Sequence, residues 1–148
     1  MRKVSMFIAG CFVFAMAISM FGQARDLDTI MKEINPLWQG AAGAPGLGSR
    51  GTAILDSATP DLAKVAADAA KLQSLFTEAA GEFTKLKMAE PAGMAKTIAD
   101  AAGNLAKEAK AGKITDAKAS KTAIGQCGAC HMKFREPDPA GGFKLKAQ

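Results

Sequence analysis

Hydrophobic residues recur at intervals of three and four along most of the chain, which is the spacing of amphipathic helices. No strand-like alternation of useful length occurs between residues 25 and 136. Short connections between successive helices favour antiparallel neighbours, so the pattern predicts an all-α fold, an antiparallel up-down-up-down four-helix bundle. The predicted helices are residues 26–38, about 59–88, about 91–111 and about 115–136.

Residue types at the helix boundaries support these limits. Thr59 is expected to cap the second helix, with Pro60 at its first position. Pro91 is expected to open the third helix, and Gly112 is expected to end it as the C′ residue. Thr115 supplies the hydroxyl that we expect to cap the fourth helix.

Three segments interrupt or follow the helical pattern. Pro36 lies inside the first helix and is expected to kink or end it. Residues 40–57 are rich in glycine and predict a mobile surface loop. The tail over residues 137–148 has turn residues and then apolar residues that alternate with lysines. We expect this tail either to pack back onto the bundle as a short extended strap or to fray.

The N-terminus has the pattern of a secretory signal peptide. Two basic residues precede an apolar run over residues 4–21, and small residues then lead to a cleavage position before Arg25. An uncleaved membrane anchor is the alternative, because the run is almost long enough to span a bilayer. Cys11 resembles a lipoprotein site, but the apolar run continues past it. We therefore predict a signal peptide at residues 1–24, a single domain at residues 25–148, and a periplasmic protein with no membrane contact after cleavage.

The charge of the chain limits its partners. The formal net charge is +5, and loss of two basic residues with the signal peptide lowers it to +3. This small charge, without a concentrated basic patch, argues against nucleic-acid binding.

Cys127-Gly128-Ala129-Cys130-His131 has the C-x-x-C-H pattern of covalent c-type haem attachment. On a helix, residues three apart share a face, so both thiols can reach the two vinyl groups on one edge of a porphyrin. The adjacent histidine then lies under the macrocycle, where its imidazole can bind the iron. We therefore expect one covalent haem c, with thioether bonds from Cys127 and Cys130 and with His131 as the proximal iron ligand.

Three other interpretations of the motif are less well supported. A thioredoxin-like pair requires a βαβ context and a cysteine near a helix N-terminus, whereas this motif closes a predicted helical segment. A zinc site requires a fourth ligand, and the mature chain has no further cysteine or histidine. A disulfide between Cys127 and Cys130 would close a small, strained ring.

A four-helix chain with this motif in its last helix resembles the class II c-type cytochromes, the cytochrome c-prime family. The matching stretch is CGACHMKFR over residues 127–135, with an aromatic residue and then Arg135 after the histidine. The segment Ile30-Met31-Lys32 matches the distal segment of the family, and the resemblance covers essentially all of residues 25–148. Two features depart from the family pattern. The Gly-rich loop replaces part of a usually continuous first helix, and Leu27-Asp28 stands in place of a basic residue and a glutamine.

The resemblance implies how the coordination of the iron is completed. His131 is the only histidine, so two histidines of one chain cannot both bind the iron. In low-spin family members a methionine at the position of Met31 is the distal ligand, and Met94 is a distant second candidate. In five-coordinate members an apolar side chain at that position crowds the distal face instead. Met31 as ordinary core filling is the alternative from its place on an apolar helix face.

Three further residues are candidate haem contacts. Phe76 and Phe83 lie on the apolar face of the second helix and fit either haem contact or plain core. Arg135 is expected either over the proximal side, where its charge raises the reduction potential, or as an exposed cation at the helix end.

Two iron coordinations imply two functions. With His131 and Met31 both bound, the geometry changes little between redox states, which suits one-electron transfer with redox partner proteins. With His131 alone, an open distal face would bind nitric oxide or carbon monoxide. A structural helical protein with an incidental motif is a third hypothesis. We expect no enzymatic activity, because no acid–base pair accompanies the haem, and the family suggests a homodimer through the first two helices.

Overall fold

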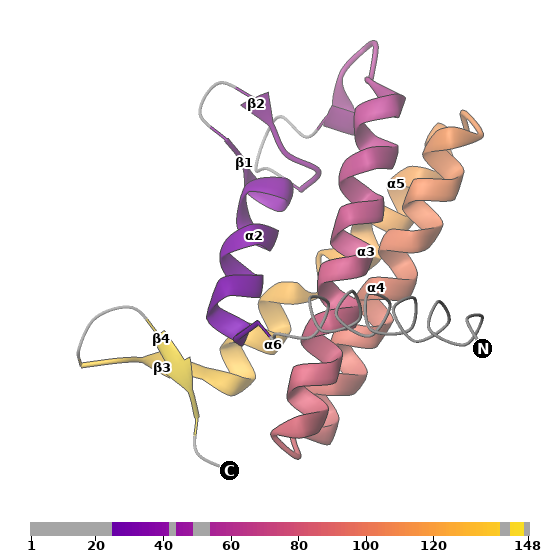
Figure 1. The fold of residues 1–148 in the computed structure, drawn as a ribbon. Coiled ribbons are helices and arrows are strands. Elements are labelled where there is room, and N and C mark those ends of the chain that lie inside the picture. The colour runs from indigo at the N-terminus through magenta and orange to yellow at the C-terminus, as the bar shows by residue number, and fades with distance from the viewer. Residues whose placement is uncertain (1–24, 42–43, 49–53, 140–142, 147–148) are drawn as a thin grey trace, which may run out of the picture.

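The computed structural model describes residues 25–41, 44–48, 54–139 and 143–146, and these residues are mostly helical (Figure 1). The prediction of a mostly helical bundle is confirmed. The predicted signal peptide at residues 1–24 lies outside the described residues. The helices are α2 (Leu27–Gln39), the short 3-10 helix η2 (Ile54–Asp56), α3 (Leu62–Lys85), α4 (Ala89–Lys110), α5 (Ile114–Ile124) and α6 (Cys127–Phe134).

The centre of the bundle is a hairpin of α3 and α4, which pack side by side along their lengths (Figure 1). α5 packs against α4, and α2 packs against α3. Alanines at the helix contacts allow close approach, and larger side chains fill the core between them. The largest fully buried side chains are Ile30, Leu47, Leu55, Leu72, Leu105, Ile124, Val65 and Pro91.

α3 and α4 end in the same way, with a left-handed residue at the C′ position. Gly112 has φ +71° and donates its N–H to Ala109, so the predicted end of this helix is confirmed. At the end of α3 the equivalent residue is Lys87, with φ +59°. Because a side chain is unfavourable in this conformation, Lys87 is a strained position.

Some predicted helix starts are wrong by a few residues. The N-cap of α3 is Asp61, whose carboxylate accepts the Lys64 N–H at 2.9 Å, and not Thr59. The carboxylate satisfies a free N–H of the first turn, whereas the Thr59 N–H bonds to the Ser57 hydroxyl. α4 begins two residues before Pro91, which is therefore in its first turn but does not open it.

The fourth predicted helix is also different. It starts one residue before Thr115, without a side-chain cap, and it is not continuous. The helix is interrupted at Gly125 and Gln126, which separate α5 from α6. Pro36 does not end α2, which continues to Gln39.

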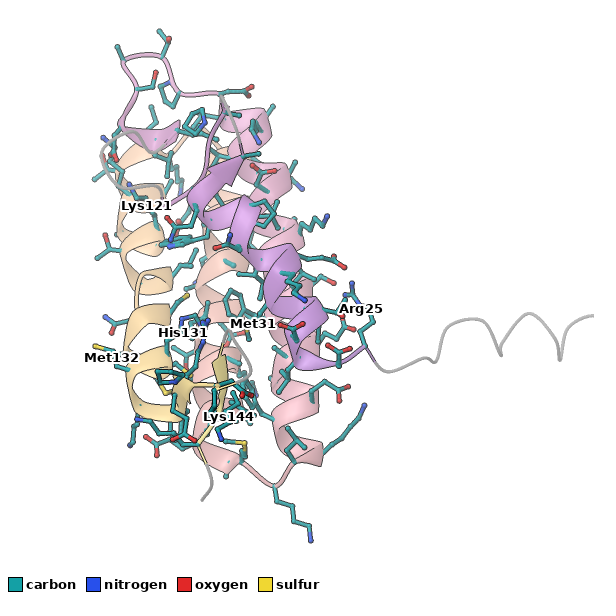
Figure 2. The ribbon with its side chains drawn as sticks, turned by 90° about the vertical axis from the view of Figure 1, so that its left-hand side faces the viewer. Arg25, Met31, Lys121, His131, Met132 and Lys144 are labelled. Atoms are coloured by element: carbon teal, nitrogen blue, oxygen red, sulfur yellow. The ribbon has the colours of Figure 1, made fainter. Side chains whose placement is uncertain are left out.

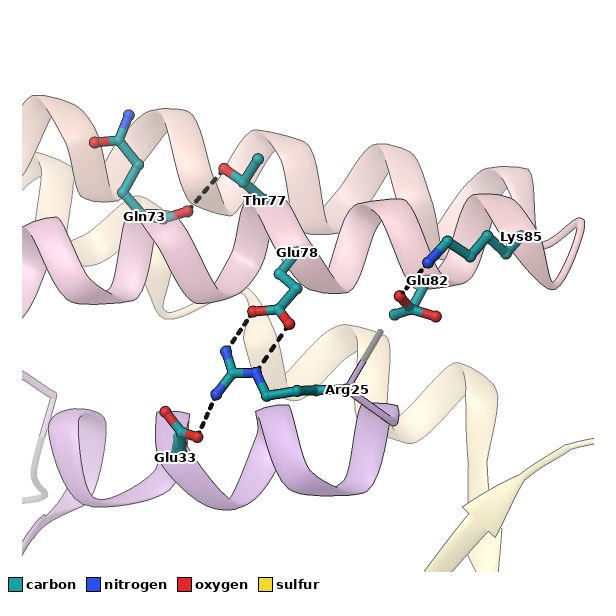
Figure 3. Close-up of polar contacts among 7 residues, drawn as sticks. All are labelled: Arg25, Glu33, Gln73, Thr77, Glu78, Glu82 and Lys85. Carbon is teal, nitrogen blue, oxygen red and sulfur yellow. Dashed lines mark hydrogen bonds and ion pairs between the residues drawn. The ribbon is translucent and has the colours of Figure 1, made fainter. Parts of the chain in front are cut away.

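A polar cluster fixes the beginning of α2 on α3 (Figure 3). Arg25 donates from its Nε to Glu78 at 2.9 Å, and its other nitrogens pair with Glu78 and Glu33. The Arg25 guanidinium holds the pKa of the Glu78 carboxyl below its usual range. Asp26 caps α2 by accepting the Thr29 N–H at 2.7 Å. This cluster sets the position of the helix that carries Met31.

Two short antiparallel strand pairs were not predicted. Gly40–Ala41 (β1) pairs with Ala44–Pro45 (β2) inside the Gly-rich stretch. Arg135–Pro137 (β3) pairs with Phe143–Leu145 (β4), so the described part of the tail folds back as a hairpin. The prediction of a plain surface loop over 40–57 is also wrong in part, because the large apolar side chains of Leu47, Ile54 and Leu55 are buried.

Within the part of the chain that the structure describes, no helix has the length and apolar character needed to cross a membrane.

Candidate haem-attachment site

The candidate site is built on α6, the shortest α-helix of the described residues. A helix of this length is not stable by itself in water, so its conformation depends on tertiary contacts. Its sequence places Cys127 at its first residue and His131 in its last turn. Phe134 is its buried residue, with 6% of its surface exposed. α6 contacts α4 and continues directly into β3.

The two thiols lie one turn apart on α6, and both are free. Cys127 and Cys130 are half-buried and pack against the hydrophobic core. The Cys127 Sγ lies 2.9 Å from the Ile124 carbonyl oxygen and donates to it. Both sulfurs therefore combine partial exposure with a fixed helical spacing, as attachment to one planar ligand requires.

The surroundings keep both thiols protonated near neutral pH. Burial raises the pKa of the Cys127 thiol to about 11. Burial also raises the pKa of Cys130, and the negative charge of Glu90 adds to this effect. Neither thiol is therefore a ready thiolate.

The position of Cys127 in the structure changes one argument against a thioredoxin-like pair. Cys127 is at the N-terminus of α6, so our expectation that the motif only closes a helix is wrong. The thioredoxin interpretation still lacks its context, because the described fold has no βαβ unit and the pKa of Cys127 is raised instead of lowered. In the described residues, no three or more His, Cys, Asp and Glu side chains are grouped to hold a metal ion.

His131 is exposed on α6, next to the second cysteine. Partial removal of water lowers the pKa of its imidazole, and the positive charge of Arg135 lowers this pKa further. The neutral imidazole, which is the form that binds iron, is therefore favoured. Arg135 is half-buried at the C-cap of α6 and donates its N–H to the His131 carbonyl oxygen. Arg135 therefore contacts His131 through its backbone, and its side-chain charge lowers the pKa of the imidazole.

Met31 lies on α2, and α6 lies beside the N-terminal half of that helix in both views (Figures 1 and 2). Figure 2 shows Met31 and His131 in the same region between the two helices. Met31 is half-buried and packs against the core.

The other methionines of the described residues are placed differently. Met132 is 77% exposed and extends to the outer side of α6 (Figure 2), whereas Met88 is buried at the turn between α3 and α4. Met94 is half-buried on α4.

Phe76 and Phe83 are both buried core residues of α3, with 5% and 4% of their surfaces exposed. Their placement supports the core interpretation that the sequence left open. A role in contacting haem stays a prediction.

Sequence reasoning missed the residues that hold α6 against the bundle. Lys133 forms an ion pair with Glu90 in the first turn of α4, and its ammonium lies 5.3 Å from the centre of the Phe134 ring. Lys146, beyond β4, hydrogen-bonds to two carbonyl oxygens of α6. No local sequence pattern marks such contacts, because the partners are far apart along the chain.

The residues of the site fit a covalently attached haem. Two free and accessible thiols have the required spacing, and a neutral imidazole is on the same short helix. A methionine of the neighbouring helix lies on the side of α6 that faces the bundle (Figure 2). Comparisons with protein-family models, with curated proteins and with solved structures find no match for this chain.

Proposed function

We propose that this chain is a monohaem c-type cytochrome that carries single electrons between partner proteins. When bound, haem supplies an iron that accepts and releases one electron. In this proposal Cys127 and Cys130 hold one haem c through thioether bonds, and His131 is the proximal iron ligand. The family to which we assign it is that of cytochrome c-prime and its class II relatives.

One observation carries the proposal. α6 combines two free half-exposed thiols one turn apart with an imidazole next to the second of them. The lowered pKa of His131 keeps the ring nitrogen unprotonated for binding, and the raised pKa of Cys127 keeps its thiol in the neutral form near pH 7. These are properties of an attachment site and not of a thiolate centre.

We assign Met31 as the distal iron ligand. Its support is the position of α2 beside α6 and the half-buried state of the side chain, which leaves its sulfur near the region of His131 (Figure 2). In the proposed up-down-up-down bundle of α2, α3, α4 and the interrupted pair α5–α6, the two ligands come from the first and the last helix. A rigid bundle that holds both ligands in each redox state would keep the reorganisation energy small.

The alternative is a five-coordinate protein that binds nitric oxide or carbon monoxide at an open distal face. The observation that favours it is the packing of Met31 against the core, because an apolar side chain in that place fills space without binding iron. The two functions differ only in whether the Met31 sulfur reaches the iron.

The proposed location is the periplasm, after removal of residues 1–24. The proposed partners are redox proteins, and no enzymatic reaction is part of the proposal. A homodimer through α2 and α3 is proposed from the family resemblance alone.

The test is the visible absorption spectrum of the exported protein, oxidised and reduced, with and without carbon monoxide. We expect sharp reduced bands, a methionine–iron charge-transfer band and no response to carbon monoxide. Met31→Ala should remove the charge-transfer band and create a response to carbon monoxide. Met94→Ala is the matched control, since Met94 is also half-buried against the core, and it should leave the spectrum unchanged.

Two results would contradict parts of the proposal. A broad high-spin spectrum that already responds to carbon monoxide in the unmodified protein would exclude Met31 ligation and make gas binding the function. Absence of haem absorption after export with the maturation machinery would exclude both functions.

A further inference from the structure

The C-terminal end of α6 is capped by a residue from outside the helix. The last four carbonyl groups of a helix have no partner within it. In α6 the Met132 carbonyl oxygen accepts a hydrogen bond from the Lys146 Nζ at 3.0 Å, and the Phe134 carbonyl oxygen accepts the Lys146 N–H at 2.9 Å. The His131 carbonyl oxygen accepts the N–H of Arg135. Lys146 therefore satisfies two of the four terminal carbonyls by itself.

The β3–β4 hairpin brings Lys146 to this position. Arg135 is paired with Leu145 in the antiparallel register, and Glu136 is paired with Lys144. The Lys144 Nζ and a Glu136 carboxylate oxygen lie 3.6 Å apart, which adds an ion pair to the same two strands. The residue after this ladder is Lys146, so the strand register itself places its backbone and side chain at the end of α6.

The chemistry of the contact favours a stabilising role. The carbonyl end of a helix carries a partial negative charge, and an ammonium there is favourable. Its hydrogen bond to Met132 is charge-assisted and so is stronger than a bond between neutral groups. The two cysteines that pack against the core lie in the first turn of α6, whereas its last turn has the buried Phe134 and the exposed Lys133–Glu90 ion pair. The Lys146 cap therefore adds to a small number of contacts at that end of the helix.

We propose that Lys146 is a positioning residue for His131, acting through the last turn of α6 and not by contact with the haem. This inference rests on the proposed function for the identity of the iron ligand. In structural terms, the β3–β4 hairpin of the tail is a strap that keeps the His131 backbone in one conformation. The competing explanation is that Lys146 is a surface lysine whose contacts have no effect on the site.

The first experiment measures amide hydrogen exchange in the full chain as purified after export. Lys146→Met removes the ammonium but keeps the backbone N–H and much of the side-chain length. We expect the Arg135 amide, which bonds to His131, to lose protection by about fivefold, as for the loss of one hydrogen bond. Lys146→Arg should restore it. Lys110→Met is the matched control, because Lys110 is an exposed lysine in the last turn of α4, and it should leave the Arg135 amide unchanged.

The second experiment separates the ligand from the fold. In a urea titration the visible spectrum reports histidine ligation, while far-UV circular dichroism reports the helices. For Lys146→Met we expect the spectrum to change at a lower urea concentration than the circular dichroism. In the unmodified protein and in Lys146→Arg the two transitions should coincide. Deletion of residues 143–148 removes both bonds to α6 and should separate the transitions further.

The outcomes distinguish the two proposals. Haem absorption in every variant, with unchanged Arg135 exchange and coincident urea transitions in Lys146→Met, would overturn the positioning role and leave the proposed function standing. Absence of haem absorption in every variant, including the unmodified protein, would overturn the proposed function and with it the role toward an iron ligand. In that case a loss of Arg135 protection would show a helix cap only.

Discussion

Replacement of Phe134 by alanine tests what holds the attachment helix in place. Phe134 is 6% exposed and is the buried residue of α6. Truncating a buried phenylalanine costs about 3–5 kcal/mol. The Lys133–Glu90 ion pair, with side chains 58% and 56% exposed, contributes roughly 0.2–1 kcal/mol. Phe134 should therefore dominate the docking of α6, because the helix is too short to persist alone.

The assay is amide hydrogen exchange across the chain, combined with urea denaturation followed by far-UV circular dichroism. Phe134→Ala should lower the free energy of opening of α6 by about 3–5 kcal/mol. The amides of α3 should change much less, because α3 and α4 form most of the core without α6. Glu90→Gln should lower α6 protection by less than about 1 kcal/mol.

Phe76→Ala is the matched control, because Phe76 is an equally buried phenylalanine, 5% exposed, but lies in α3 of the central hairpin. It should reduce protection throughout the bundle instead of in α6 alone. A cost under about 1 kcal/mol for Phe134→Ala would contradict a dominant role of Phe134 in holding α6. The same uniform loss of protection across all helices in Phe134→Ala and Phe76→Ala would also contradict it.

Three further substitutions test other parts of the fold. Glu78→Gln removes a carboxyl whose pKa Arg25 lowers; the pair is fully stabilising above about pH 4.3, the unfolded value, and is lost as pH falls through the folded pKa. Melting temperatures from pH 7 to pH 2 should fall less steeply in the variant, and an unchanged slope would contradict this. Gly48→Ala places a Cβ 2.0 Å from Trp38 Cε2, so it should lower the free energy of unfolding by about 1–3 kcal/mol. It should also shift the fluorescence emission of Trp38, the only tryptophan, and unchanged emission would exclude the contact. Lys87→Gly relieves about 1–2 kcal/mol of strain at φ +59° and adds roughly 0.4–1 kcal/mol of unfolded-chain entropy, so it should raise stability to urea by about 0.5–1 kcal/mol. A loss of stability would show that the Lys87 side chain stabilises the turn.

The sequence predicted those features of the fold that depend on short-range patterns. Apolar spacing identified the central helices, because burial of one face requires a period of three to four residues. The end of α4 at Gly112 was predicted because a left-handed residue favours glycine. The end of α3 uses the same conformation at Lys87, and no local preference indicates it. There the surrounding structure determines the backbone and overrides the preference of the residue.

Other features were missed because two local solutions compete. Thr59 and Asp61 are both good N-caps, and the cap is formed by the residue whose oxygen reaches a first-turn N–H, here that of Lys64. The interruption at Gly125 and Gln126 has no proline to mark it. Glycine only weakens a helix, so tertiary contacts decide whether the chain continues or breaks there.

The candidate site also has a part that the sequence predicts and a part that it does not. Cys127, Cys130 and His131 are neighbours in the sequence, so one helix was enough to bring them together. Their supports are not local. Glu90 is 43 residues from its partner Lys133, and Lys146 is 14 residues from Met132. Such contacts depend on helix packing and on strand register, which a single sequence does not reveal.

Covalent haem attachment is tested by the intact mass of the exported protein after denaturation, compared with that of a Cys127→Ala/Cys130→Ala variant. We expect the unmodified chain to keep the mass of one haem through denaturation, and the double variant to lack it. An unmodified chain of bare polypeptide mass, after expression with the maturation machinery, would contradict haem attachment at Cys127 and Cys130.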